Sequence, residues 1–126
     1  MVVIWCFAVT ENLSIPHPLP PPLIELIAQR FRCLGEPMRI ALLDRLRDGE
    51  ATVGELTEAT GASQQNVSKH LGVLLGAGIV SRTKRGTSSV YAIADETVFE
   101  LCEQVCGGLR RQLDELDLIL QGGVDR

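Results

Sequence analysis

The stretch that decides the fold of this chain reads Ser63-Gln64-Gln65-Asn66-Val67-Ser68-Lys69-His70-Leu71. Ser63 is a favoured N-cap residue, so the stretch predicts the start of a helix. Apolar residues at Val67, Leu71 and Leu74 recur at helical spacing and predict the buried face of that helix. The polar side chains between them are expected on the opposite, exposed face.

The flanking residues extend this helix into a larger motif. A short helix is predicted just before it, because Thr52-Val53-Gly54-Glu55 has the form of a capping box and Gly61 can end a helix. Two strands, 79–84 and 88–93, are predicted after it, joined by a turn at Arg85-Gly86-Thr87. Helix, turn, polar helix and hairpin in this order are typical of a winged helix-turn-helix.

The remaining chain is predicted to be helical apart from its ends. Two helices are expected between Leu23 and Asp48, and one long helix after Asp95, which is read as its N-cap. The predicted fold is therefore mainly α with a small β-hairpin wing (α+β), in the order α-α-α-α-β-β-α. Residues 1–22 are assigned to an extended proline-rich arm, 23–121 to the domain with a C-terminal dimerisation helix, and 122–126 to a tail.

The charge is distributed unevenly along this acidic chain. The formal net charge is −4, and residues 1–60 and 95–126 each hold eight acidic residues. Residues 61–94 hold none, and they carry Lys69, Arg82, Lys84 and Arg85. This basic window coincides with the predicted motif, which favours a nucleic acid as its partner.

The residue types in this window suit double-stranded DNA. Gln and Asn side chains can pair with adenine in the major groove, while Lys can reach guanine or a phosphate. Cations on a hairpin can lie along the backbone or enter the minor groove. The predicted DNA-binding residues are Ser63, Gln64, Gln65, Asn66, Ser68, Lys69, His70, Arg82, Lys84 and Arg85, with His70 in a supporting role. A winged helix that binds only proteins is the alternative.

Composition narrows the other classes of function. No apolar run is long enough to span a bilayer, and the apolar N-terminus lacks the basic start of a signal peptide, so we expect a cytoplasmic location without membrane contact. The sequence contains no phosphate-binding glycine loop, no HExxH and no nucleophile elbow, so we expect no enzyme activity.

Several segments together resemble the ArsR/SmtB-type family of bacterial repressors, which respond to metals and redox agents. The resemblance extends from about residue 25 to 110. The matching segments are 31–40 (FRCLGEPMRI), 52–56 (TVGEL), 63–71 (SQQNVSKHL), 74–80 (LLGAGIV) and 86–93, which ends in Tyr91-Ala92-Ile93. The resemblance implies a homodimer built on the first and last helices. It also implies a two-fold DNA operator and release from that operator by an inducer.

Two inducer sites known in that family are not matched by this sequence. The stretch Glu50-Ala51-Thr52-Val53-Gly54 lacks the Cys-x-Cys pair of one site. For the other site, Asp95 matches the first ligand, but Thr97 stands where a histidine is expected and Gly107-Gly108 lie near the later positions. Neither site is therefore expected here.

Cysteines offer a different inducer site. Cys102 and Cys106 are four residues apart, so both thiols lie on one face of the last helix. With a third thiol, from Cys33 or a partner chain, they can hold a thiophilic ion such as As(III), Cd, Pb or Zn as inducer, with no resident cofactor required. Three alternatives stay open: a redox switch through a disulfide to Cys33, a role for Cys6, and cysteines that only pack in a repressor without a metal site.

Overall fold

The computed structural model describes residues 14–124 of the 126-residue chain. The chain divides into two units, one up to Pro37 and one from Met38 onward, and each is described separately. Cys6 lies outside the described residues, as does most of the predicted N-terminal arm.

Helix α2 (Pro21–Leu34) is the regular element of the first unit. It begins two residues before the predicted start at Leu23, so Pro21 and Pro22, assigned above to an extended arm, form its first turn. Proline is tolerated there because the first amides of a helix have no partner within the helix. Cys33 and Leu34 are buried, whereas Ile24, Leu26 and Phe31 are about half exposed or more.

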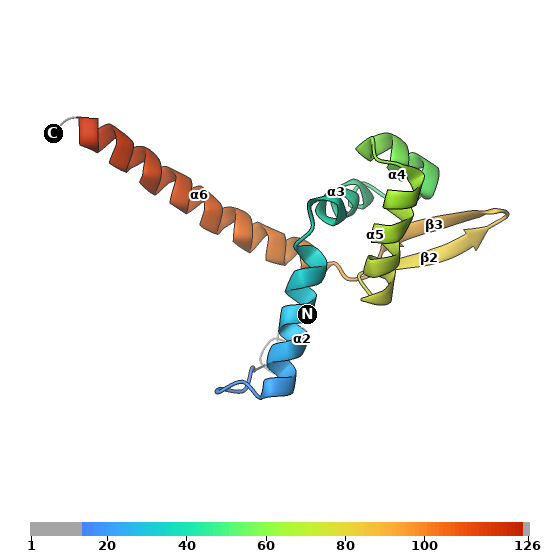
Figure 1. Ribbon diagram of the computed structural model, residues 1–126, viewed down its shortest axis with the longest axis horizontal. Coiled ribbons are helices and arrows are strands. Elements are labelled where there is room, and N and C mark those ends of the chain that lie inside the picture. The colour runs from blue at the N-terminus through green and yellow to red at the C-terminus, as the bar shows by residue number, and fades with distance from the viewer. Residues whose placement is uncertain (1–13, 125–126) are drawn as a thin grey trace, which may run out of the picture. The chain divides into compact units, whose positions relative to one another are not determined.

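The second unit contains a helical core built almost only of aliphatic side chains. Its helices are α3 (Pro37–Leu46), α4 (Val53–Thr60) and α5 (Gln64–Gly76), and Figure 1 shows α5 lying beside the start of a β-hairpin. The largest fully buried side chains come from all three helices and from the residue before the hairpin: Leu42, Leu56, Val67, Leu71, Leu74 and Ile79. This core fixes the orientation of α5.

The hairpin belongs to a small antiparallel sheet. Strands β2 (Val80–Arg85) and β3 (Ser88–Ile93) pair from Val80 with Ile93 to Arg85 with Ser88. Strand β1 (Ala51–Thr52) pairs with the other edge of β3, so the strand order is β1-β3-β2. Gly86, at the first position of the two-residue turn, has φ 65°, which L side chains rarely adopt and type II′ hairpin turns require.

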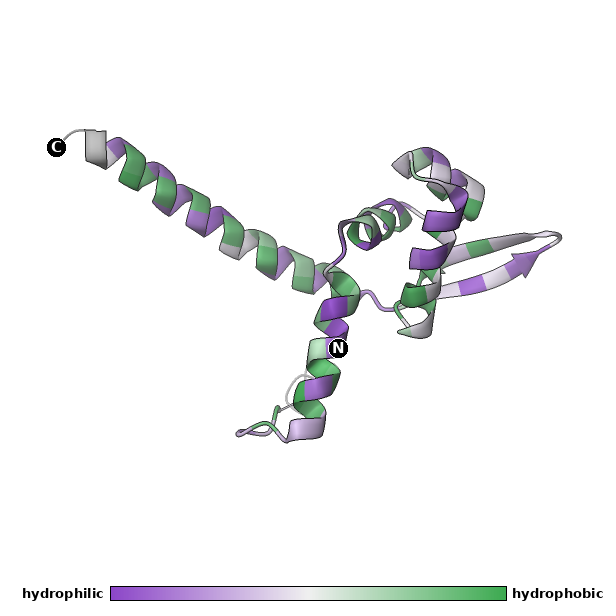
Figure 2. Ribbon diagram, viewed as in Figure 1, coloured by the Kyte–Doolittle hydropathy of each residue, from purple (hydrophilic) through white to green (hydrophobic). Residues whose placement is uncertain are grey.

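Helix α6 (Thr97–Val124) has 28 residues and forms the C-terminal part of the second unit. Its first turn is attached to the core through Val98, which is 3% exposed. Further along, Figure 2 shows green and purple residues alternating around the helix, and its apolar side chains are largely exposed: Val105, Leu109, Leu113, Leu116, Leu118, Ile119 and Leu120. None of the described helices combines the length and the apolar character needed to cross a membrane.

The predicted fold class and the order of its main elements are confirmed. The described residues contain five helices, and the predicted hairpin follows the fourth one. Two details differ from the prediction. Strand β1 was not predicted, because two residues are too short for a periodic pattern, and Arg85 ends β2 instead of lying in the turn.

The capping box of α4 is confirmed atom by atom. Thr52 Oγ1 accepts a hydrogen bond from the Glu55 amide at 3.2 Å, and the Thr52 amide donates to Glu55 Oε1 at 2.9 Å. The helix ends at Gly61, whose φ of 73° places it in the left-handed region. These two ends set the length of α4 and hence the tight turn that leads to α5.

We expect Thr52→Ala to lower the free energy of unfolding by about 1 kcal/mol, because it removes the N-cap acceptor. For a domain of this size the midpoint of thermal unfolding should fall by roughly 3–6 °C at fixed protein concentration. Thr87→Ala, at an exposed position in the wing turn, is the matched control and should leave the midpoint nearly unchanged. Equal midpoints for both variants would contradict the stabilising role of the box.

Candidate nucleic-acid interface

Helix α5 divides into a buried face and an exposed polar face. Val67, Leu71 and Leu74 are fully buried, whereas the side chains of Gln64, Gln65, Ser68 and Lys69 are exposed. Residues four apart share a face of a helix, so Gln65 lies beside Lys69 and Gln64 beside Ser68. A helix of 13 residues is about 20 Å long, which suits insertion into a major groove.

Two residues at the start of α5 are engaged in capping. Ser63 Oγ accepts a hydrogen bond from the Asn66 amide at 3.1 Å, which confirms Ser63 as the N-cap. Asn66 is half-buried, whereas Ser63 is exposed. Together with Gln65, Lys69 and Ala62 they line a shallow hollow of about 410 Å³ in the exposed face.

His70 lies on the buried side of α5, at 7% exposure. Its Nδ1 is 3.0 Å from Nη1 of Arg39 on α3. An arginine side chain can only donate, so Nδ1 is the acceptor and the proton of the neutral ring is on Nε2. The contact joins α5 to α3, which agrees with a supporting position for His70 and places it away from the exposed polar face.

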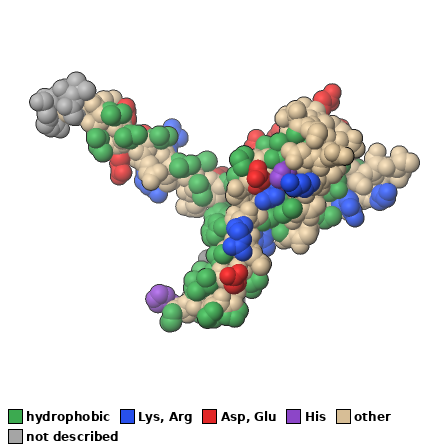
Figure 3. All heavy atoms as spheres, in the orientation of Figure 1, with side chains coloured by type: hydrophobic (Ala, Val, Ile, Leu, Met, Phe, Trp, Pro, Cys, Tyr) green, Lys and Arg blue, Asp and Glu red, His purple; other side chains and the backbone are tan. Residues whose placement is uncertain are grey.

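The wing, defined as the β2–β3 hairpin, separates the three predicted cations. Side chains alternate along a strand, so Arg82 and Lys84 point to one face of the hairpin and Arg85 to the other. All three residues are exposed, and Figure 3 shows Lys and Arg side chains gathered on the hairpin. Within residues 14–124, the ion pairs found include Arg85 but neither Arg82 nor Lys84.

Arg85 is held by Glu50, the residue before β1. Nη1 and Nη2 of Arg85 donate to the two carboxylate oxygens of Glu50 at 2.6 and 3.2 Å. This hydrogen-bonded pair, with the attraction between the opposite charges, raises the pKa of Arg85. The positive charge of Arg85 is therefore balanced by the Glu50 carboxylate. The sequence prediction grouped Arg85 with Arg82 and Lys84 and did not include Glu50. No pattern in the sequence marks a partner 35 residues away.

The described residues of the predicted thiol site lie on α2 and α6, in different units. Cys102 is half-buried and Cys106 exposed, one turn apart on α6, while Cys33 is a buried residue of the first unit. Among residues 14–124, no three His, Cys, Asp or Glu side chains come together in a way that could hold a metal ion. Asp95 was predicted as the N-cap of the last helix, but α6 begins at Thr97, so Asp95 lies two residues before it and accepts a hydrogen bond from the Thr97 amide at 3.0 Å.

Comparison with known proteins agrees with this geometry. A helix-turn-helix domain family matches residues 34–83. The HTH-type transcriptional regulator Rv0081 of Mycobacterium tuberculosis is 35% identical over 101 residues, which are 79% of this chain and 89% of that protein. A probable mercury resistance operon repressor of Streptomyces lividans is 39% identical over 92 residues, 73% of this chain and 69% of that protein.

Solved structures share the fold as well. The homodimeric winged helix-turn-helix DNA-binding domain of Mb0332 from Mycobacterium bovis superimposes with a TM-score of 0.65 at 27% identity, covering 79% of this chain and 95% of that one. Fold and relatives together define the class: the chain is a winged helix-turn-helix transcriptional regulator, not an enzyme. It belongs to the ArsR/SmtB family of these regulators.

We expect Glu50→Gln to strengthen binding to a random-sequence DNA duplex by about two- to fivefold, because it frees the Arg85 guanidinium for a phosphate.

Lys84→Ala should lower the slope of log K against log salt by about 1, and Arg85→Ala by less, because Glu50 offsets its charge. Fluorescence anisotropy over a salt series measures both quantities.

Two controls separate the Arg85 contact from a general change of charge. Glu58→Gln on α4 makes the same charge change at another exposed position and should have a smaller effect. In an Arg85→Ala background, Glu50→Gln should no longer strengthen binding. An undiminished gain in that background would show that Glu50 acts without Arg85.

Proposed function

We propose that the chain is a homodimeric repressor in which α5 of each copy enters one half-site of a two-fold operator. The observation that carries this proposal is the position of α5: its apolar face is anchored in the core, and its polar face lies in the longest stretch of the chain without acidic residues. Such a repressor acts where the chromosome is, which in a bacterium is the cytoplasm.

The side chains of this surface receive distinct roles. Gln64 and Gln65 pair with base edges, and Ser68 and Lys69 extend the contact to bases or phosphates. Arg82 and Lys84 contact the phosphate backbone from the wing, where they fix the register of the protein on DNA without reading sequence. Ser63 and Asn66 hold the start of the helix, and His70 holds its orientation through Arg39. Arg85 contributes less, because Glu50 offsets its charge.

A second copy of this chain is proposed to cover the exposed apolar side chains of α6. Val105, Leu109 and Leu116 recur at steps of four and seven residues, and all are more than half exposed. Exposed apolar residues on one side of a helix favour association over an isolated chain. The M. bovis relative with the same fold is described as homodimeric, which supports the same assembly here.

Selection from a random pool of duplex DNA tests operator binding. We expect the wild type to enrich one two-fold sequence, to bind it as a dimer, and to bind it at least about 10³ times more tightly than random DNA. Gln65→Ala should lose preference at one base pair per half-site, at a cost of about 1–3 kcal/mol, while its affinity for random DNA is kept.

Gln104→Ala, at an exposed position of α6, is the matched control and should leave the preference unchanged. The repressor proposal would be contradicted if the wild type enriched no sequence or bound DNA without salt dependence. Either result would favour a protein-binding module.

The inducer is proposed to be a thiophilic metal ion or metalloid. Two thiolates one helical turn apart, at Cys102 and Cys106, suit a soft ion, and deprotonated sulfur is its preferred ligand. The Streptomyces relative named for mercury resistance supports this class of ligand. For a three-coordinate ion such as As(III) a third ligand is needed, for which Cys33, Cys6 or the partner copy are the candidates.

We expect a few equivalents of As(III), Cd²⁺ or Hg²⁺ to weaken binding of the enriched duplex by at least about tenfold, a typical allosteric coupling. Cys102→Ser should abolish this release without changing the affinity of the metal-free protein. Zn²⁺, peroxide and persulfide are tested in parallel, and release by an oxidant alone identifies a redox switch instead.

Cys33→Ser decides whether this buried thiol supplies the third ligand. Unchanged release in Cys102→Ser under every treatment would leave these cysteines with a packing role only, in a repressor whose inducer is not bound by thiols.

A further inference from the structure

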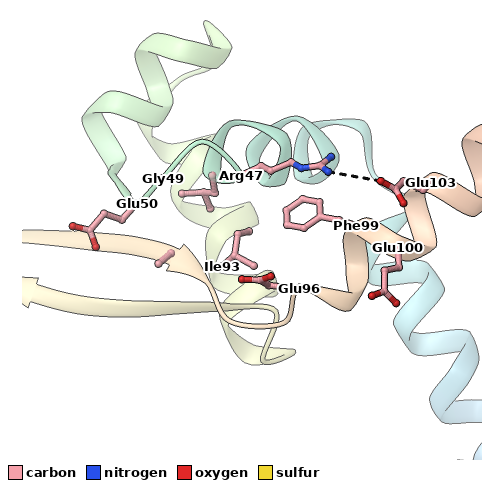
Figure 4. Close-up of a pocket in the computed structure, with 10 residues that line it drawn as sticks. Arg47, Gly49, Glu50, Ile93, Glu96, Phe99, Glu100 and Glu103 are labelled. Atoms are coloured by element: carbon pink, nitrogen blue, oxygen red, sulfur yellow. Dashed lines mark ion pairs between the residues drawn. The ribbon is translucent and has the colours of Figure 1, made fainter. Parts of the chain in front are cut away.

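We infer that Arg47, through Phe99 and Glu103, sets the angle between α6 and the helical core and thereby fixes the half-site spacing that the dimer accepts. This inference rests on the proposed dimeric operator binding. Arg47 follows directly after α3, and Figure 4 shows its side chain reaching across to α6. We call these three residues the Arg47 clamp.

Two contacts form the clamp. The guanidinium carbon of Arg47 lies 4.8 Å from the centre of the Phe99 ring, within the range of a cation–π interaction. Its Nη2 is 3.8 Å from Oε2 of Glu103. Phe99 and Glu103 are four residues apart, so one side of α6 presents both to the same cation. Arg47 thereby contacts α6 over a full helical turn.

Acidic side chains surround Arg47 where the helical core meets α6. The clamp borders a hollow of about 450 Å³ between the end of α3, β3 and the start of α6, whose charged lining residues are Arg47, Glu50, Glu96, Glu100 and Glu103. The lining therefore holds one cation and four carboxylates, of which Glu50 is paired with Arg85 and Glu103 with Arg47. Without the clamp, the acidic side chains at the start of α6 would repel one another and the end of the core next to Glu50.

The clamp contacts the start of a long helix, so a small change of angle there displaces the far end of α6. Val98 is buried and Phe99 contacts Arg47 in the first turn of α6, whereas Val105 and the apolar residues beyond it are exposed and proposed to contact the second copy. A helix of 28 residues is about 42 Å long, so a tilt of about 5° at its first turn moves the far end by about 3.5 Å. One base-pair step is about 3.4 Å, so a small tilt is enough to change which spacing fits.

Duplexes of altered spacing test the clamp. The probe is the duplex enriched by the wild type, with one base pair inserted or deleted between its half-sites, which moves one half-site by about 3.4 Å and about 35°. The wild type should bind the altered duplexes about tenfold or more weakly. Glu103→Gln and Phe99→Leu should still form dimers but discriminate between spacings less than about threefold.

Glu100→Gln is the matched control for charge. It removes the same charge from the same helix, but the Glu100 carboxylate points away from Arg47 in Figure 4, and among the described ion pairs none includes it. Its spacing profile should equal that of the wild type. If only the total charge mattered, Glu103→Gln and Glu100→Gln would strengthen DNA binding equally, and both variants would keep the spacing preference of the wild type. That result would overturn the inference.

Amide hydrogen exchange of the free protein tests the clamp without DNA. Residues 97–103 should exchange at least about threefold faster in Glu103→Gln and Phe99→Leu than in the wild type and in Glu100→Gln, because the first turns of α6 lose an anchor. Unchanged exchange in Glu103→Gln overturns the clamp whatever the DNA result. A wild type that enriches no duplex contradicts the operator proposal instead, while the exchange data still decide on the clamp.

Discussion

The structure depends on the burial of one face of α5. Val67, Leu71 and Leu74 are fully buried against a core that includes Leu42 and Leu56, and this burial leaves one orientation for the polar side of the helix. Each buried aliphatic side chain contributes about 1.5–3 kcal/mol, a large share of the stability of a small domain. The helix proposed to contact DNA is therefore also central to the core, and the core holds its orientation.

The helical elements could be predicted because their signals are local. Ser63 bonds an amide three residues later, as Thr52 does at the start of α4, and the buried positions of α5 recur every three or four residues. Strand β1 could not be predicted, because its two residues become a strand only by pairing with β3, about 40 positions away. Signals within a few residues therefore predict the helices, whereas strand β1 can be recognised only in the folded chain.

The candidate interface was predictable only in its composition. The sequence placed three cations on the wing, but alternation along β2 separates Arg85 from Arg82 and Lys84, and Glu50 binds it. The Arg39–His70 and Arg47–Glu103 contacts are equally long-range, and each joins a helix end to a different helix. A single sequence records which charges exist, whereas only the fold decides which of them meet.

Weak contacts at such joints can matter more for recognition than for stability. Arg47 and Glu103 are 54% and 69% exposed, so their ion pair is worth less than about 1 kcal/mol, and the stacking on Phe99 adds about 0.5–1 kcal/mol. Against a folding free energy of about 5–15 kcal/mol this is a minor term. Discrimination between two operators, however, depends on a difference, and about 1.4 kcal/mol changes a binding ratio tenfold. A strong contact would hold α6 in one position, whereas a weak one would let the inducer proposed to bind this helix shift the equilibrium between positions.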